Sequence, residues 1–205
     1  QQNFTNEGGY DYRFRYLKNI MGLWMIQSIR RELNGVDYVE GKGQARQKAK
    51  LQIGFGDLSD AARRSSDFHS VVDVNDDRFL SPDSMIQEIK DACADTDQPI
   101  PQTTGELMQC VYLSLSKCYA EAIQKLSGLT GKTYTSINIV GGGCQDMYLN
   151  EMTAKASGLP VYAGPIEGTA LGNLMVQMIH TGEFTDLQEA RNAVRASFDI
   201  REIKA

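Results

Sequence analysis

The sequence predicts an α/β fold that is rich in helices in its first half and has a short central sheet in its last third. Apolar residues recur at helical spacing in the first half, and strand-like and helix-like segments alternate after residue 136. The 205 residues are 41% hydrophobic and 23% charged, which is typical of a globular protein with a buried core. This length fits one large domain or two small ones.

A helical pattern of apolar residues covers residues 16–33, and Asn34 and Gly35 are typical of its end. Residues 37–56 are polar and glycine-rich, with a basic run over 42–50, and we interpret them as a loop on the surface. Later in this half, we expect a helix over 58–64, a strand over 71–74, a turn over 75–77, a helix from Ser81-Pro82 to about 94, a linker over 96–101 and a helix over 104–126.

The last third has a different pattern. Its expected elements are a strand over 136–140, a glycine turn over 141–143, a helix over 146–157, a strand over 161–163, and helices over 168–179 and 187–196. The order of strand, turn, helix and strand predicts a β-α-β unit, in which the two strands are parallel and the crossover is right-handed.

The charge and hydropathy patterns exclude several classes of protein. Lys and Arg total 21 and Asp and Glu total 26, a formal net charge of −5 that argues against a non-specific nucleic-acid binder. No run of 18 apolar residues predicts a membrane span, and the first residues lack the basic and apolar regions of a signal peptide. His69 and His180 lie far apart in dissimilar contexts, so we interpret them as partly exposed and expect no metal site. We therefore expect a cytoplasmic protein.

The four cysteines, at positions 93, 110, 118 and 144, include no C-x-x-C motif and do not suggest a disulfide-rich scaffold. Cys93 and Cys110 lie near the facing ends of two consecutive expected helices, so they could be close enough to form a disulfide. Two packed, reduced thiols are the alternative that a reducing compartment favours.

The glycine turn over 141–143 is the most informative local motif. Glycine permits positive φ and close approach of a ligand to the backbone, and the N-terminus of the following helix favours an anion or a polar ring edge. The motif is neither a Walker A loop nor a G-x-G-x-x-G fingerprint, because Cys144, Gln145 and Asp146 follow it. Taken alone, it is compatible with a structural turn or with a nucleotide site.

A longer string that contains this turn resembles the C-terminal domain of FGGY-family carbohydrate kinases. It runs from Val-Gly-Gly-Gly-Cys-Gln-Asp at 140–146 to Gly-Thr-Ala-Leu-Gly-Asn at 168–173. Residues 3–9, 17–24 and 75–79 add similar strings in the same order. The similarity is greatest to the branch of the family that acts on L-rhamnulose.

The resemblance implies a two-domain kinase of the actin-like ATPase, ribonuclease-H-like fold, in which ATP and the sugar meet between the domains. Residues 1–205 are similar to the nucleotide-side domain, so the partners expected are ATP or ADP, a ketose and an N-terminal domain of the same kinase. The family's general base and phosphate loop have no match here, and the sequence does not start with Met. We therefore expect part of an enzyme, inactive alone, that uses ATP with Mg²⁺ to convert L-rhamnulose to its 1-phosphate.

The resemblance also assigns roles to individual residues. The nucleotide-binding positions are Gly142, which would touch ATP, its neighbours Gly141 and Gly143, and Gln27. The substrate-binding position is Asn19, and no catalytic residue is assigned. On one helix, Asn19 and Gln27 would lie about 80° apart and could share a face.

Two acidic residues near these positions have a structural interpretation. Many relatives have Asn at the position of Asp146; an ionised carboxylate there cannot donate a hydrogen bond, so we expect Asp146 to cap the following helix. We assign no chemistry to Glu167, which precedes the last long helix. Two other functions remain open: an FGGY kinase for another sugar, and a stand-alone nucleotide-binding regulatory module.

Overall fold

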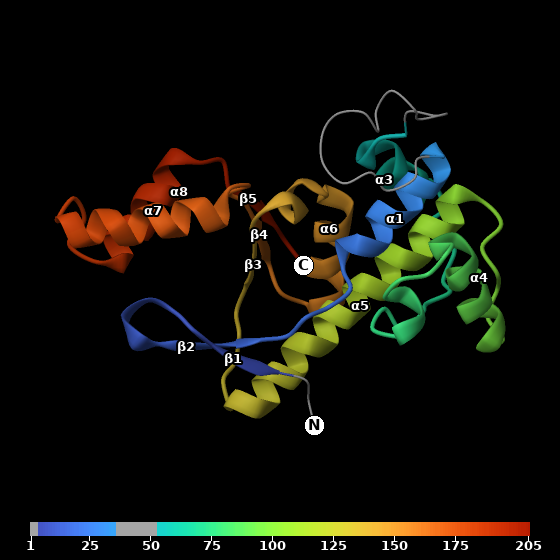
Figure 1. Cartoon of the computed structure of the whole chain (residues 1–205), viewed down its shortest axis with the longest axis horizontal. Coiled ribbons are helices and arrows are strands. Elements are labelled where there is room, and N and C mark those ends of the chain that lie inside the picture. Colours follow the sequence, from blue (N-terminus) through green and yellow to red (C-terminus); the bar gives the residue numbers. More distant parts are fainter. Residues whose placement is uncertain (1–3, 36–52) are drawn as a thin grey trace. The chain divides into compact units, whose positions relative to one another are not determined.

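The computed structural model describes residues 4–35 and 53–205 (Figure 1). The chain divides into two compact units. Unit 1 comprises Gln1–Asn19 and Ala122–Ala205, and unit 2 comprises Ile20–Glu121. Most of the surface loop expected over 37–56 lies outside the described residues. Its last residues are described: Ile53 bonds to Asn34, and Phe55 begins a helix.

Unit 1 contains two small sheets. Its elements are β1 (Thr5–Gly8), the 3₁₀ turn η1 (Tyr10–Tyr12), β2 (Phe14–Leu17), β3 (Ile137–Ile139), the 3₁₀ turn η3 (Gly142–Gln145), α6 (Met147–Ser157), β4 (Val161–Ala163), α7 (Gly168–Thr181), α8 (Leu187–Ser197) and β5 (Arg201–Ile203). Strands β1 and β2 form an antiparallel hairpin. The second sheet has the order β3-β4-β5, in which β3 and β4 are parallel and β4 and β5 antiparallel. The predicted parallel pair is therefore confirmed, whereas β5 was not predicted.

The two faces of the three-stranded sheet differ in burial. Val161 and Ala163 are buried on the face that α6 covers. Tyr162 alternates to the opposite face, as expected for a strand, and pairs in register with Asn138 and Glu202. The core of unit 1 therefore lies on one side of this sheet.

The predicted helix over 16–33 was wrong at its start. Tyr16 and Leu17 belong to β2, where they pair with Asn6 and Thr5, and helix α1 (Leu23–Asn34) begins after Gly22. Gly22 has a φ of 54°, which a right-handed helix cannot continue through. The predicted end is confirmed, because Gly35 caps α1 in the left-handed conformation.

Unit 2 is a cluster of helices. It contains α1, α3 (Phe55–Arg64), the 3₁₀ turn η2 (Asp77–Phe79), α4 (Met85–Asp95) and the first part of α5 (Thr104–Thr130), which ends in unit 1. Its largest fully buried side chains are Met25, Ile26, Ile29, Leu58, Phe79, Met85, Ile89, Met108, Tyr112 and Leu115. Helix α5 packs closely on α3, because a Cβ added to Gly105 would lie 2.7 Å from the Ala61 carbonyl oxygen.

The strand predicted over 71–74 is not formed. The backbone there is bonded to side chains: Val71 donates to Gln98 Oε1 at 2.9 Å, Gln98 Nε2 donates to the Val71 carbonyl at 2.7 Å, and Val72 donates to Ser114 Oγ at 2.9 Å. These bonds satisfy the backbone groups that a neighbouring strand would otherwise satisfy. A turn follows, but the bond from Asp76 N to Asp73 O begins it two residues before the predicted 75–77, and Asp77 already begins η2.

Helix α4 begins three residues later than the Ser81-Pro82 pair predicted. Ser84 is its N-cap, and the Glu32 carboxylate accepts hydrogen bonds from Ser84 Oγ at 2.8 Å and from the backbone of Met85 and Ile86. Because Glu32 lies on α1, a carboxylate distant in sequence fixes where α4 starts. The N-terminus of a helix favours such a negative charge.

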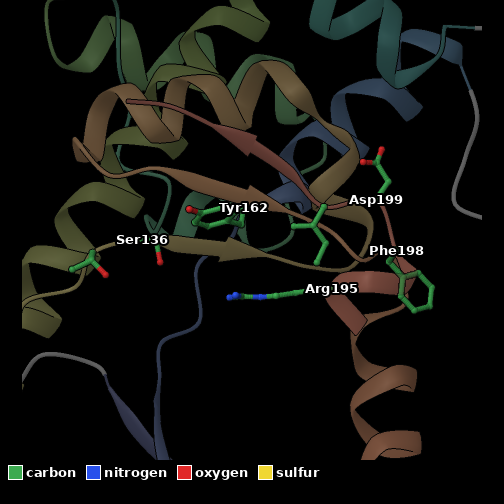
Figure 2. A pocket seen from close by; sticks show the side chains of 7 residues that line it. Ser136, Tyr162, Arg195, Phe198 and Asp199 are labelled. Carbon is green, nitrogen blue, oxygen red and sulfur yellow. The ribbon is translucent and has the colours of Figure 1, made fainter. Parts of the chain in front are cut away.

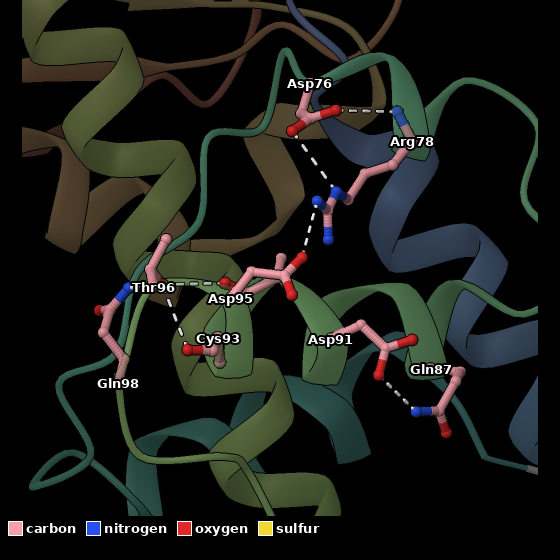
Figure 3. A network of polar contacts seen from close by, with 9 residues as sticks. Asp76, Arg78, Gln87, Asp91, Cys93, Asp95, Thr96 and Gln98 are labelled. Atoms are coloured by element: carbon pink, nitrogen blue, oxygen red, sulfur yellow. Dashed lines mark hydrogen bonds and ion pairs between the residues drawn. The ribbon is translucent and has the colours of Figure 1, made fainter.

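The other end of α4 is joined to the segment before it by Arg78 (Figure 3). The guanidinium of Arg78 lies 3.0 Å from Asp95 and 3.4 Å from Asp76. The Asp76 carboxylate also accepts from the Arg78 backbone N–H, so it caps η2. Arg78 therefore connects η2 with the last turn of α4.

Cys93 of α4 and Cys110 of α5 are both buried, and their sulfur atoms are 3.9 Å apart, as free thiols. The predicted proximity is therefore confirmed, and no disulfide is formed. The hydrogen bond to Cys93 and burial raise the pKa of Cys110, whereas the same hydrogen bond lowers the pKa of Cys93.

Replacing Glu32 tests the contact between α1 and α4. We expect Glu32→Gln to lower the free energy of unfolding by about 1–3 kcal/mol, because a neutral amide cannot replace both carboxylate oxygens as acceptors. Urea denaturation followed by circular dichroism would measure this change. Exposed Glu183 provides the control Glu183→Gln, and equal midpoints for the two variants would contradict the proposed contribution.

The cysteine pair gives a second prediction. Protein purified without reductant and then denatured should contain four titratable thiols, and a count of two would show that a disulfide forms. In the native protein, Cys118 should react first with a thiol reagent, because it is the least buried of the four. Mass spectrometry of the labelled peptides would identify the order of reaction.

Candidate functional site

The glycine turn connects β3 to α6 through the short 3₁₀ turn η3. Gly141 has a φ of 76° and is the one glycine of the three with a positive φ. Its N–H donates to the Pro165 carbonyl at 3.2 Å, and its carbonyl accepts from Cys144 N at 3.1 Å. A side chain at Gly141 would strain this backbone, so glycine is required there for conformation.

A second turn lies beside the first, because β3 and β4 are parallel and their carboxyl ends meet at one edge of the sheet. Gly164, which follows β4, donates its N–H to the Ile139 carbonyl of β3 at 2.8 Å. A Cβ added to Gly168 would lie 2.7 Å from Val140 Cβ, so the start of α7 is also in close contact with the end of β3. The two turns therefore form one continuous backbone surface.

The next two glycines supply backbone N–H groups that η3 itself does not use. Gly142 and Gly143 are the first residues of η3, so their N–H groups have no acceptor within that turn. Gly142 is exposed, and a Cβ added to it would meet no atom within 4 Å. The surface can therefore accept the polar edge of a ring or an anion next to the start of α6.

Asp146 has the capping role predicted from the sequence. It is the N-cap of α6, and its Oδ1 accepts from the backbone N–H of Leu149 at 3.2 Å. Glu167 occupies the corresponding position before α7, but its exposed side chain makes no capping hydrogen bond. The structure thus gives Asp146 a structural function and leaves Glu167 without one.

The two polar residues predicted on one helix do not both lie on it. Gln27 is exposed on α1 in unit 2, whereas Asn19 lies before α1, in the connection from β2, and is the last residue of unit 1. The prediction that they share a helix face was therefore wrong, because the hairpin and Gly22 delay the start of α1. The three predicted glycines, which are consecutive in the chain, lie in unit 1. The roles of Gln27 and Asn19 remain predictions.

A cavity of about 570 Å³ lies elsewhere in unit 1 (Figure 2). The Arg195 side chain extends from α8 toward Tyr162 of β4 and Ser136, the residue before β3. The full lining is Thr135, Ser136, Tyr162, Arg195, Phe198, Asp199 and Ile200. The sequence analysis nominated none of these residues, since they come from four separate segments that no motif connects.

The described residues contain neither a candidate metal site nor a candidate membrane span. In 4–35 and 53–205, no group of three or more His, Cys, Asp or Glu side chains could hold a metal ion. His69 and His180 are both exposed, in agreement with their interpretation from the sequence. None of the helices in this part of the chain has the length and apolar character needed to cross a membrane.

Comparison with known proteins gives a consistent result. The profile of the C-terminal domain of the FGGY family of carbohydrate kinases matches residues 1–181. The chain is similar to the rhamnulokinases of Halalkalibacterium halodurans (42% identity over 199 residues), Oceanobacillus iheyensis (43% over 198) and Bacillus subtilis (42% over 201). These alignments cover 97–98% of this chain and 38–39% of the relatives, so the chain spans about two fifths of their length.

Proposed function

The chain belongs to the FGGY family of carbohydrate kinases, and we propose that it forms the nucleotide-side domain of a kinase that phosphorylates L-rhamnulose. The observation that carries this proposal is the identity of 42–43% with proteins named rhamnulokinase over almost the whole chain. The product would be L-rhamnulose 1-phosphate, and the reaction would belong to rhamnose catabolism. The rest of the enzyme would be an N-terminal domain with the sugar site and the general base, and the fold would be that of the actin-like ATPases.

The glycine turn supports a nucleotide role for this chain. Gly142 is exposed, the N–H groups of Gly142 and Gly143 have no acceptor within η3, and Gly141 supplies the positive φ that turns the chain there. In phosphoryl transfer, the protein acts mainly by positioning its substrates and by electrostatic stabilisation. We assign to these residues the binding of ATP, and not a chemical step.

Each of the two remaining predicted residues would contact one of the two substrates. Gln27 would contact the nucleotide from α1, and Asn19 would contact the sugar. Mg²⁺ would neutralise charge on the ATP phosphates and would be held chiefly by them, since such sites commonly use few protein ligands.

A kinase assay on the full-length protein tests the proposal. With ATP and Mg²⁺, ADP release should be faster with L-rhamnulose than with D-xylulose or L-ribulose, and NMR should identify the 1-phosphate. The 205-residue chain alone should bind ATP weakly and give no turnover, because half of a cleft cannot position both substrates. Turnover by the chain alone, or a preference for another sugar, would contradict the proposal.

Substitution of Gly142 tests the nucleotide surface. Gly142→Val in the full-length enzyme should raise the KM for ATP about tenfold, equivalent to about 1.4 kcal/mol, and change the KM for the sugar much less. A Cβ added at this position would meet no atom within 4 Å and Gly142 has no positive φ, so the fold should be retained.

Gly128 of α5 provides the matched control, because a Cβ added there also meets no atom within 4 Å. Gly128→Val should leave both KM values unchanged. If folded Gly142→Val keeps the KM for ATP of the wild type, the turn has only a structural role.

A further inference from the structure

A buried amide lies directly behind the glycine turn. Asn150, on the second turn of α6, is 1% exposed, and its Nδ2 donates to the Cys144 carbonyl at 3.0 Å. Cys144 is itself buried and belongs to η3, the 3₁₀ turn that begins with Gly142 and Gly143. A side chain of the helix is thereby bonded to the backbone of the turn.

This bond acts together with two others on the same short segment. The Gly141 N–H donates to Pro165 O and holds the start of the turn, and Asp146 caps α6 at the end of the turn. Asn150 holds the backbone between these points, at the carbonyl of Cys144. Gly142 and Gly143 have no side chains that could restrain this segment, so the bond to Cys144 O is a side-chain restraint placed immediately after them.

Packing alone does not explain an amide at this position. The Asn150 Oδ1 atom is buried and has no hydrogen-bond partner among the described residues. A buried polar atom without a partner lowers stability, so an apolar side chain of similar size would fill the space at lower cost. The amide retains one function that leucine cannot perform, which is donation to Cys144 O.

We propose that Asn150 is a positioning residue for ATP: it fixes the glycine turn so that the N–H groups of Gly142 and Gly143 keep the orientation that the nucleotide requires. Asn150 does not touch the nucleotide, since its side chain is buried behind the turn. This inference rests on the proposed nucleotide function of the turn. It adds a residue that neither the motif nor the glycine positions indicate.

The experiment compares Asn150→Leu with the wild type in the full-length kinase. Loss of the hydrogen bond should raise the KM for ATP, and the Kd for ATP by isothermal titration calorimetry, about fivefold. The KM for the sugar and kcat should change less than twofold. If Asn150→Leu does not fold, Asn150→Ser serves instead, because its shorter side chain cannot reach Cys144 O.

Thr153 provides a matched control on the same helix. It is also 1% exposed, and its hydroxyl donates to the Leu149 carbonyl within α6 at 2.8 Å, away from the turn. Thr153→Val therefore removes a buried polar group without loosening the turn, and it should leave the Kd for ATP unchanged.

The outcomes separate this inference from the proposed function. If the wild type binds ATP and the Asn150 variants bind it equally well, the positioning role is wrong and the nucleotide site stands. An equal loss of affinity in Thr153→Val would also overturn the positioning role, because general loosening of α6 would then explain the effect. A wild type that binds no ATP would overturn both.

Discussion

The parallel pairing of β3 and β4 is the constraint on which the candidate site depends. Each strand has three residues, but parallel pairing brings the turns after both strands to the same edge of the sheet. The bonds from Gly141 to Pro165 and from Gly164 to Ile139 then join these turns. Without this pairing, the glycine turn would be an isolated loop, and its N–H groups would have no fixed direction.

The turn itself combines backbone freedom with restraint from its surroundings. Three consecutive glycines leave the surface free of side chains, which permits a ligand to approach but makes the segment intrinsically pliable. The cap at Asp146 and the amide of Asn150 supply rigidity from α6. If the turn binds the nucleotide as proposed, these restraints would help it to position its ligand, which is the main task of the protein in phosphoryl transfer.

Unit 2 is organised by side chains that bond to the backbone of distant segments. Glu32 fixes the start of α4, Gln98 satisfies the backbone of Val71, and the buried side chain of Asn34 bonds to both the N–H and the carbonyl of Ile53. Such bonds replace sheet pairing in a unit built of helices. The two bonds of Asn34 thereby join the end of α1 to the residue that precedes Gly54.

The sequence by itself determined the presence of the periodic helices but not every boundary, together with the strand-turn-helix-strand order, the parallel pair, the cap at Asp146 and the family. These features depend on local patterns and on a long specific string. The resemblance to the family nominated Gly142 as a contact to ATP, and its exposure became known only from the structure. Only the tertiary structure decided that Tyr16 and Leu17 form a strand, that α4 starts after Ser84 and that Asn150 holds the turn. Each of these depends on a partner distant in sequence or on burial, and no local spacing encodes either one.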